Sequence, residues 1–445
     1  MLLAILALAS ASIAARGQTP AASPLPTPSS TGSAAPVLTL DEALRLSLAQ
    51  ASTFTEAQLN ERIAAEDLKQ ARAALMPKIS APLTYLYTSP ALGLPPGEPR
   101  TPSFIANNSI GEYEALVNVS GDFDIAGKLR ATVAKNQALL AAAHAGTDVA
   151  QRALRQALLE AYYGYSLALA ALRAAEQNLA AAEEFERITE LLVSGGEVAA
   201  VDLTRAQLQS NTRRDELERA RANEIVSGGA LRVLIGYDFL RPFESSDLLN
   251  AMPADNDLRD LNVSEVARRP EFIQLDQQLR AAQQDTRIAR ADRLPSLSYS
   301  INGGFDTDSL HPARLKEHSG VSAGISLNVP IFDWGAAKSR ERQARLHVQL
   351  AENERVIAER GFTQQYYSAL AQVNRAATRI RLAGTAITLA RSNLEASIAR
   401  YRAGEAQIIE VTDAQTTLVT ERLALYQAIF DYQTALGRLR QATGR

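Results

Sequence analysis

Two segments in the second half of the chain alternate apolar and polar residues almost without interruption. In the segment 296–305 the odd positions carry apolar residues or glycine: Leu297, Tyr299, Ile301, Gly303 and Phe305. In the segment 320–331 the odd positions are apolar throughout, from Val321 to Ile331. A period of two predicts a strand with one apolar and one polar face, and about ten residues is the length of a tilted strand that crosses a bilayer. A water-soluble sheet with one buried face would give the same pattern.

The same pattern occurs earlier in the chain. The segments from Ile79 to Tyr87 and from Tyr113 to Phe123 alternate in the same way, with Leu86 and Leu116 out of phase. Polar loops rich in proline and glycine, 88–111 and 306–319, join the strands of each pair. We therefore predict two β-hairpins, at 79–123 and 296–332, and no further strand.

Nearly all of the remaining sequence is typical of long helices. The stretches 126–193 and 335–402 contain no proline, and each would form a rod of roughly 100 Å at 1.5 Å per residue. Their partner helices are expected at 198–238 and 408–443. In the last of these, apolar residues follow the 7, 4, 3, 4, 3 spacing of a coiled-coil seam: Leu418, Leu425, Ile429, Tyr432, Leu436 and Leu439.

The two halves of the chain are copies of one another. Met76-Pro77-Lys78-Ile79-Ser80 before the first hairpin lines up with Leu294-Pro295-Ser296-Leu297-Ser298 before the second, and Tyr162-Tyr163 lines up with Tyr366-Tyr367. Each copy opens with a short helix, one behind a capping box that starts at Thr39 and one that starts at Asn262 or Ser264 and is interrupted at Arg269-Pro270-Glu271. The duplication predicts a first repeat at 38–238, a polar linker at 239–262 and a second repeat at 263–443.

The composition favours an exported protein without catalytic chemistry. The chain has no cysteine, four scattered histidines and a net charge of −3, so it offers no disulfide frame, thiol nucleophile or nucleic-acid footprint. We expect no enzyme activity, no cofactor and no metal site. The apolar run 1–15 is typical of a secretory signal peptide cut near Ala15, and 16–37 is typical of a disordered spacer.

Four strands per chain are too few to close a barrel, and a sheet that spans a membrane cannot leave its edges in lipid. Three chains of four strands would supply twelve, an even number within the range of known membrane barrels. The sequence therefore predicts a homotrimer whose long helices continue the pore below the membrane. The fold class is mainly α, with a long coiled-coil helical barrel and a small transmembrane β-barrel that trimerisation closes.

The chain resembles the TolC-like outer-membrane efflux family over about residues 38–443. The resemblance rests on the repeated order of helix, hairpin and helical pair and on local motifs. These motifs are Asn328-Val329-Pro330-Ile331-Phe332-Asp333-Trp334-Gly335, Tyr401-Arg402-Ala403-Gly404, Ile409-Glu410-Val411 and Asp413-Ala414-Gln415. The segment Phe123-Asp124-Ile125-Ala126-Gly127-Lys128 is reminiscent of the heavy-metal branch. The resemblance implies an outer-membrane duct with a long periplasmic extension that docks a periplasmic adaptor protein and an inner-membrane transporter.

The resemblance also implies functional positions at the tips of the two helical hairpins. Gly196 and Gly404 match the tip glycines at which adaptors engage, although a simple helix C-cap would also explain them. Four residues match the periplasmic gate: Asp202, Tyr401, Glu410 and Asp413. Acids on a solvated helix face are the plainer interpretation. The family's latch arginine is replaced by Ala406, which implies a different latch.

Two other functions fit the same pattern. An exit duct for a type I protein exporter would have the same channel and a different pump. A soluble periplasmic coiled-coil scaffold would need its two hairpins to pack on each other. Phe332 and Trp334 could anchor the chain at a membrane interface or pack at the strand-to-helix bend, and the paired tyrosines are expected to fill the helix bundle.

Overall fold

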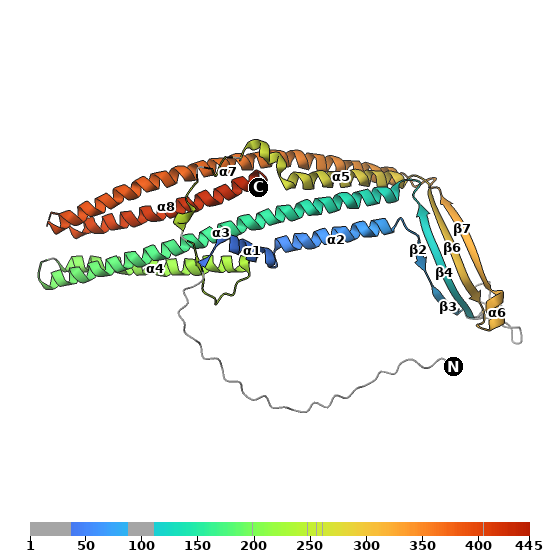
Figure 1. Cartoon of the computed structure of the whole chain (residues 1–445), viewed down its shortest axis with the longest axis horizontal. Coiled ribbons are helices and arrows are strands. Elements are labelled where there is room, and N and C mark those ends of the chain that lie inside the picture. Colours follow the sequence, from blue (N-terminus) through green and yellow to red (C-terminus); the bar gives the residue numbers. More distant parts are fainter. Residues whose placement is uncertain are drawn as a thin grey trace, which may run out of the picture.

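The computed structural model describes residues 37–87, 111–197, 199–246, 248–254, 256–259, 261–403 and 405–445. The expected signal peptide 1–15, the spacer up to residue 36, most of the loop 88–111 and Gly404 lie outside the described residues. So do the side chains of Tyr401, Arg402 and Ile408. Figure 1 shows an elongated rod of helices that carries one small sheet at one end.

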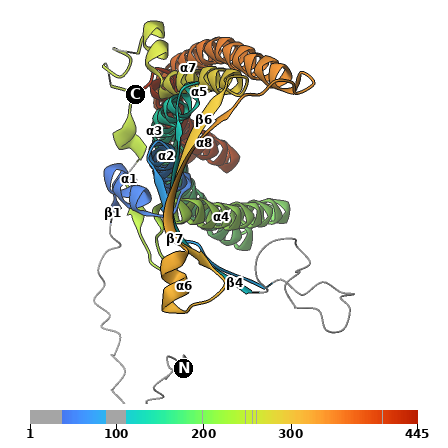
Figure 2. The same cartoon turned by 90° about the vertical axis from the view of Figure 1, so that its right-hand side faces the viewer.

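Long helices account for most of the described chain, as the sequence predicts. Their bounds are α1 Leu40–Ala49, α2 Thr53–Ala73, α3 Lys128–Ser194, α4 Ala200–Ile235, α5 Pro270–Ala291, α6 Pro312–Glu317, α7 Ala336–Arg402 and α8 Ile408–Ala442. Toward the sheet α2 packs on α3, α3 on α5 and α5 on α7. Away from the sheet α3 pairs with α4 and α7 with α8, and α3 also packs on α8. Figure 2 views the rod from the end that carries the sheet.

The short helices begin where their capping residues predict. The N–H of Glu42 donates to Thr39 Oγ1 over 3.3 Å, and the N–H of Thr55 donates to Ser52 Oγ over 3.4 Å. In the second repeat Asn262 precedes the 3-10 helix η2, Val263–Arg268, and Pro270 occupies the first turn of α5. Proline suits this place because the first helical N–H has no partner within the helix.

An aspartate caps each long helix at its junction with the sheet. The carboxylate of Asp124 accepts the N–H groups of Leu129 and Arg130 at 2.9 and 3.0 Å, and that of Asp333 accepts those of Gly335 and Ala337. The bond from Ala337 lowers the pKa of the Asp333 carboxyl. Gly127 and Gly335 have φ values of 73° and 85°, which glycine adopts without strain. The Phe-Asp motif in both copies therefore has a local structural purpose.

The two hairpins form one antiparallel sheet. Its strands are β2 Lys78–Ser80, β3 Leu83–Tyr87, β4 Gly111–Phe123, β6 Ser296–Thr307 and β7 Ser319–Asn328. β2 and β3 both pair with β4, β4 pairs with β6, and β6 pairs with β7. The hairpins thus join through β4 and β6, which leaves β7 at one edge and the β2–β3 row at the other.

The register puts the alternating residues of all rows in phase. Ile79, Val119, Ile301 and Ala323 lie in one cross-strand line, and Ser80, Asn118, Asn302 and Ser322 lie in the next. The amide of Asn118 donates to Asn302 Oδ1 on this polar face. The two exceptions in the pattern, Leu86 and Leu116, pair with Glu112 and Gly304. The apolar face is bare in this chain, since Leu83 is 82% and Val321 78% exposed.

Several details differ from the sequence prediction. A parallel pair of two-residue strands, β1 Val37–Leu38 and β5 Glu244–Ser245, was not expected, and it includes Val37 from the expected spacer. Two residues are too few to show alternation. The first strand breaks at Ala81-Pro82 and the last ends at Asn328 before Pro330, since proline cannot donate to the ladder. The loop 306–319 contains the short helix α6.

Two equivalent tyrosines hold the connecting segments against the helices. Tyr162 is 1% exposed; its hydroxyl donates to Leu38 O over 2.8 Å and accepts the N–H of Ser246 over 3.2 Å. Tyr366 is 6% exposed and donates to Leu261 O over 3.0 Å. These contacts confirm that Tyr162 and Tyr366 fill the bundle, and Tyr163 packs partly buried beside them. The expectation is wrong for Tyr367, which is 57% exposed. Tyr162 and Tyr366 lie in buried clusters at the middle of the rod, one with Leu158 and Leu231 and the other with most of the α8 seam.

The coiled-coil seam of α8 is confirmed. Ile429, Leu436 and Leu439 are at most 1% exposed, Tyr432 is 2% and Leu418 7% exposed, and Leu425 packs against the same cluster. Tyr432 also donates to Asp257 Oδ2 over 3.0 Å. Burial and this bond raise the pKa of Tyr432 to about 12, so its hydroxyl remains a donor at any physiological pH.

The tyrosine contacts predict a stability difference between neighbouring residues. Tyr162→Phe and Tyr366→Phe should each destabilise the protein by about 1–3 kcal/mol, because a buried carbonyl loses its donor. Tyr367→Phe is the control, since Tyr367 is 57% exposed. Thermal unfolding in detergent, followed by circular dichroism, measures the difference. Equal melting temperatures for all three variants would show that the hydroxyls contribute no stability.

Candidate functional site

The tip of the first helical pair is a tight turn that depends on Gly196. The N–H of Gly196 donates to Val193 O over 3.0 Å, and that of Glu197 donates to Leu192 O over 2.9 Å. This pattern is the Schellman motif, which places a left-handed residue just after the helix. Gly196 has φ 75°, and a β-carbon there would meet nothing within 4 Å. The structure thus confirms the helix-cap interpretation of Gly196.

The second tip closes in the corresponding way. The N–H of Glu405 donates to Arg400 O over 2.9 Å, which matches the bond from Glu197 to Leu192. Gly404, the expected counterpart of Gly196, lies outside the described residues. Tyr401 lies in the last turn of α7, and its side chain is likewise not described. The two tips are therefore equivalent in the part of the backbone that the structure describes.

The acids that follow each tip share one structural position. Asp202 is the third residue of α4 and Glu410 is the third residue of α8. The N–H of each donates to the capping residue's carbonyl, at Ala199 and Gln407. A carboxylate in the first turn of a helix is stabilised by the helix dipole. This local effect accounts for an acid six residues after each glycine, whether or not a gate is present.

The second tip carries an ion pair that the first does not. Arg400, in the last turn of α7, donates from Nη1 to Glu410 Oε2 over 3.0 Å and from Nη2 to Glu405 O over 3.4 Å. Both side chains are about half exposed, at 54% for Arg400 and 42% for Glu410. Asp413 is exposed one turn further along α8. At the first tip Asp202 pairs with Arg205 of its own helix over 3.4 Å.

A polar contact also joins the two helical pairs near their tips. Arg213 of α4 donates from Nη2 to Thr416 Oγ1 of α8 over 3.0 Å, and from Nη1 to both oxygens of Glu216. The Arg213 side chain is only 17% exposed. Arg400 and Arg213 were missed from sequence. Arg400 lies ten residues from Glu410, and Arg213 lies 203 residues from Thr416, so no local spacing indicates either contact.

The described residues contain no group of three or more histidines, cysteines or acids that could hold a metal ion. Among the helices in the described part of the chain, none combines the length and apolar character of a membrane span. The tips consist of turns, exposed acids and arginines. These groups suit electrostatic contacts and docking.

The fold and these tips define a class of elongated, mainly helical chains that carry a small one-faced sheet at one end. The family model described as "Outer membrane efflux protein" matches residues 43–237 and 263–445, so the chain belongs to that family. The resemblance to TolC-like proteins and the expected outer-membrane location are thereby confirmed. Members of this family are channels and not enzymes.

Individual relatives are distant. The chain is 25% identical to outer membrane efflux protein BepC of Brucella suis over 279 residues, which cover 62% of this chain and 59% of BepC. It is 25% identical to alkaline protease secretion protein AprF of Pseudomonas aeruginosa, over 64% of this chain and 60% of AprF. The outer membrane channel CmeC of Campylobacter jejuni has a similar fold, with a TM-score of 0.81 at 19% identity over 91% of this chain and 85% of CmeC. The chain thus matches somewhat under two thirds of the length of these two sequence relatives.

The tip geometry predicts different responses at adjacent glycines. Gly196→Ala should destabilise the turn by about 1–2 kcal/mol, because alanine is strained in the left-handed conformation. Gly195→Ala should be nearly neutral, since Gly195 has φ −78° and its added β-carbon would be 3.6 Å from the nearest atoms. Hydrogen exchange across residues 190–199 measures the opening of the turn. Equal exchange in the two variants would contradict the role of Gly196.

Proposed function

We propose that the chain forms a homotrimeric outer-membrane channel that is the exit duct of an efflux system. Three four-row sheets would close a barrel in the outer membrane, and the helices would continue the duct into the periplasm. The duct is passive, and an inner-membrane transporter of the drug or heavy-metal type supplies the energy. A periplasmic adaptor protein docks at the tips that contain Gly196 and Gly404. Membership of the outer membrane efflux protein family supports this function.

The sheet carries the proposal. It has one apolar face that is largely exposed, and it has two open edges. Ile79, Ile325 and Leu327 are 74%, 74% and 60% exposed. In water such a face would lose the hydrophobic stabilisation of burial, and in lipid the open edges would leave backbone groups unpaired. A closed barrel made from several chains resolves both problems at once.

We infer that the second tip contributes to a gate. Three chains would bring the Glu410 and Asp413 carboxylates together at the periplasmic entrance, where negative charge favours cations. Arg400 offsets part of this charge within each chain, because it pairs with Glu410. The contact between Arg213 and Thr416 would hold the two helical pairs together in the same protomer. Tyr401 and Asp202 are the remaining members of the proposed gate.

One alternative function retains support. The chain's relative AprF is named as an alkaline protease secretion protein, which favours an exit duct for a type I protein exporter as the second candidate function. The two candidates share the channel and differ in the pump. The soluble scaffold required hairpins that pack on each other. Here they join edge to edge in one sheet, which leaves the apolar face uncovered.

The proposed barrel predicts which face of β7 tolerates charge. Ile325→Arg and Leu327→Arg should each impair membrane insertion by about 2–4 kcal/mol, because the apolar face would contact lipid. Ser326→Arg, on the opposite face, should be far milder. The amount of each variant in purified outer membranes measures insertion. Equal losses from both faces would contradict a lipid-facing sheet.

The proposed gate predicts how ion selectivity depends on charge. Asp413→Asn and Glu410→Gln should each lower cation selectivity, because each removes one negative charge per chain and Glu410→Gln also leaves Arg400 without its carboxylate partner. Arg400→Gln should raise cation selectivity, and Glu410→Ala with Asp413→Ala should lower it without loss of assembly. Each effect should weaken as salt screens the charges. Reversal potentials of channels in planar bilayers measure selectivity.

Glu354→Gln is the control for these recordings, because Glu354 is an exposed acid on α7 far from the tip. Its selectivity should equal that of the wild type. If the double variant assembles with unchanged selectivity, the acids only stabilise the start of α8. A protein that forms no conducting channel would contradict the proposed function as a whole.

A further inference from the structure

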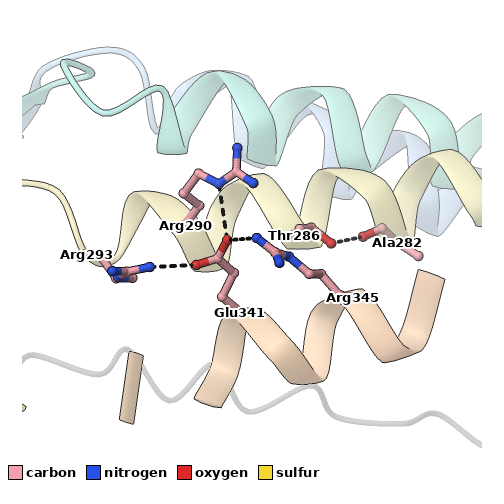
Figure 3. A network of polar contacts seen from close by, with 6 residues as sticks. All are labelled: Ala282, Thr286, Arg290, Arg293, Glu341 and Arg345. Carbon is pink, nitrogen blue, oxygen red and sulfur yellow. Dashed lines mark hydrogen bonds and ion pairs between the residues drawn. The ribbon is translucent and has the colours of Figure 1, made fainter. Parts of the chain in front are cut away.

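Three arginines converge on one buried carboxylate where the helices meet the sheet. Glu341 of α7 accepts hydrogen bonds from Arg290 Nε, Arg293 Nη1 and Arg345 Nη2 at 3.3, 2.9 and 2.6 Å (Figure 3). The Glu341 side chain is 7% exposed, whereas the three arginine side chains are 49–60% exposed. The bond from Arg293, together with those from Arg290 and Arg345, lowers the pKa of the Glu341 carboxyl. The carboxylate therefore stays ionised and fixes the positions of three partly exposed guanidinium groups.

The charge around this cluster is strongly positive. We call six basic residues of α5, the turn after it and α7 the basic collar: Arg290, Arg293, Lys338, Arg340, Arg342 and Arg345. The acids among them are Glu341, Asp292 and Asp333, and Lys128 also pairs with Asp292 over 2.8 Å. Three acids cannot neutralise six bases. Each guanidinium has five N–H groups, so the arginines retain donors for another anion.

Exposed aromatic side chains lie beside the collar. Phe332 and Trp334, on the bend between β7 and α7, are 72% and 90% exposed, and their rings meet edge to face at 4.8 Å. Trp334 has φ 57°, which is a strained conformation for a bulky residue. Apart from its edge contact with Phe332, the Trp334 ring is exposed, so it gains little packing in return for this strain. The bend therefore holds a large aromatic side chain outward.

The aromatic bend and the collar lie at one level of the molecule. Ser296, three residues after Arg293, pairs with Asn328 of β7, and the bend follows directly from Asn328. Aromatic rings favour the boundary of a bilayer, and arginine binds phosphate oxygens through two parallel hydrogen bonds. In the proposed channel this level is the end of the barrel that faces the periplasmic helices.

We infer that the basic collar and the aromatic bend bind the phosphodiester headgroups of anionic phospholipids in the periplasmic leaflet of the outer membrane. Trp334 and Phe332 would lie among the acyl-chain and glycerol groups, and the collar would face the phosphates. This inference rests on the proposed membrane channel. It assigns a lipid preference to a part of the chain that lies far from the tips.

Lipid titration of the purified assembly in detergent tests the inference. Native mass spectrometry counts the molecules of phosphatidylglycerol or phosphatidylcholine bound per assembly. The wild type should retain phosphatidylglycerol in preference to phosphatidylcholine. The triple variant Lys338→Gln, Arg340→Gln, Arg342→Gln leaves the Glu341 cluster intact, and its apparent affinity for phosphatidylglycerol should fall roughly fivefold per charge removed. Trp334→Ala should lower the affinity of the assembly for both phosphatidylglycerol and phosphatidylcholine.

A second variant tests the cluster itself without an unpaired buried charge. It combines Arg290→Gln, Arg293→Gln and Arg345→Gln with Glu341→Gln, and it should lose the preference for phosphatidylglycerol. The matched control is Arg360→Gln, Arg381→Gln, Arg391→Gln, which removes three exposed charges from the same helix outside the collar. This control should bind lipid as the wild type does. Inorganic phosphate at millimolar concentration should not displace the lipid.

Other outcomes would overturn the inference. An intact assembly that binds both phospholipids equally, or that loses the lipid to inorganic phosphate, would show that the collar is not a lipid site. Collar variants that fail to assemble but keep the lipid preference would identify the collar as a contact between chains. A wild-type chain that stays soluble without detergent would overturn both this inference and the proposed channel.

Discussion

The two open edges of the sheet are the constraint on which the rest of the structure depends. A four-row sheet with one apolar face cannot remain open in lipid, because the N–H and C=O groups of β7 and of the β2–β3 row would lack partners. One chain cannot close on itself with four rows. The same edges that would be a liability in a monomer give each chain two surfaces at which an identical chain can pair.

The duplication that the sequence predicts would account for the remaining geometry. Each repeat leads from a hairpin through an aspartate-capped bend into a helix of 67 residues, α3 in the first repeat and α7 in the second. Buried alanines of α3, such as Ala131, Ala138 and Ala145, allow neighbouring helices to approach closely. Tyr162 and Tyr366 then fix the segments around the middle of the rod by equivalent hydrogen bonds. The repeat therefore gives a chain with the same helix order on both sides of one sheet.

The sequence alone predicts those helices and strands whose apolar residues recur with a regular period. Alternation located both hairpins, and the seam from Leu418 to Leu439 identified the buried face of α8. The pair β1–β5 has too few residues to show a period. The strand break at Pro82 comes from the N–H donor that proline lacks, which an alternating pattern of apolar residues does not show. Glu341 lies 51 and 48 residues from Arg290 and Arg293, so only the fold brings these arginines to it. Arg345, four residues along α7, is the one member that helical spacing indicates.

In the candidate site too, local features could be predicted from the sequence, whereas contacts between distant residues could not. The turn at Gly196 follows from local chain geometry, and its left-handed conformation could be predicted from the glycine itself. The placement of Asp202 and Glu410 in the first turn of their helices could also have been found from the expected helix starts. The partners of Glu410 and Thr416 could not, because Arg400 and Arg213 reach them across a turn or between separate helical pairs.

The central claim is that closure by identical chains completes the sheet. The mass of the assembly extracted from outer membranes in mild detergent tests this claim most directly, with strand content measured on the same sample by circular dichroism. We expect three chains per assembly and the full strand content of the sheet. A stable monomer with the same strand content would contradict the claim, because its sheet edges would then need no partner.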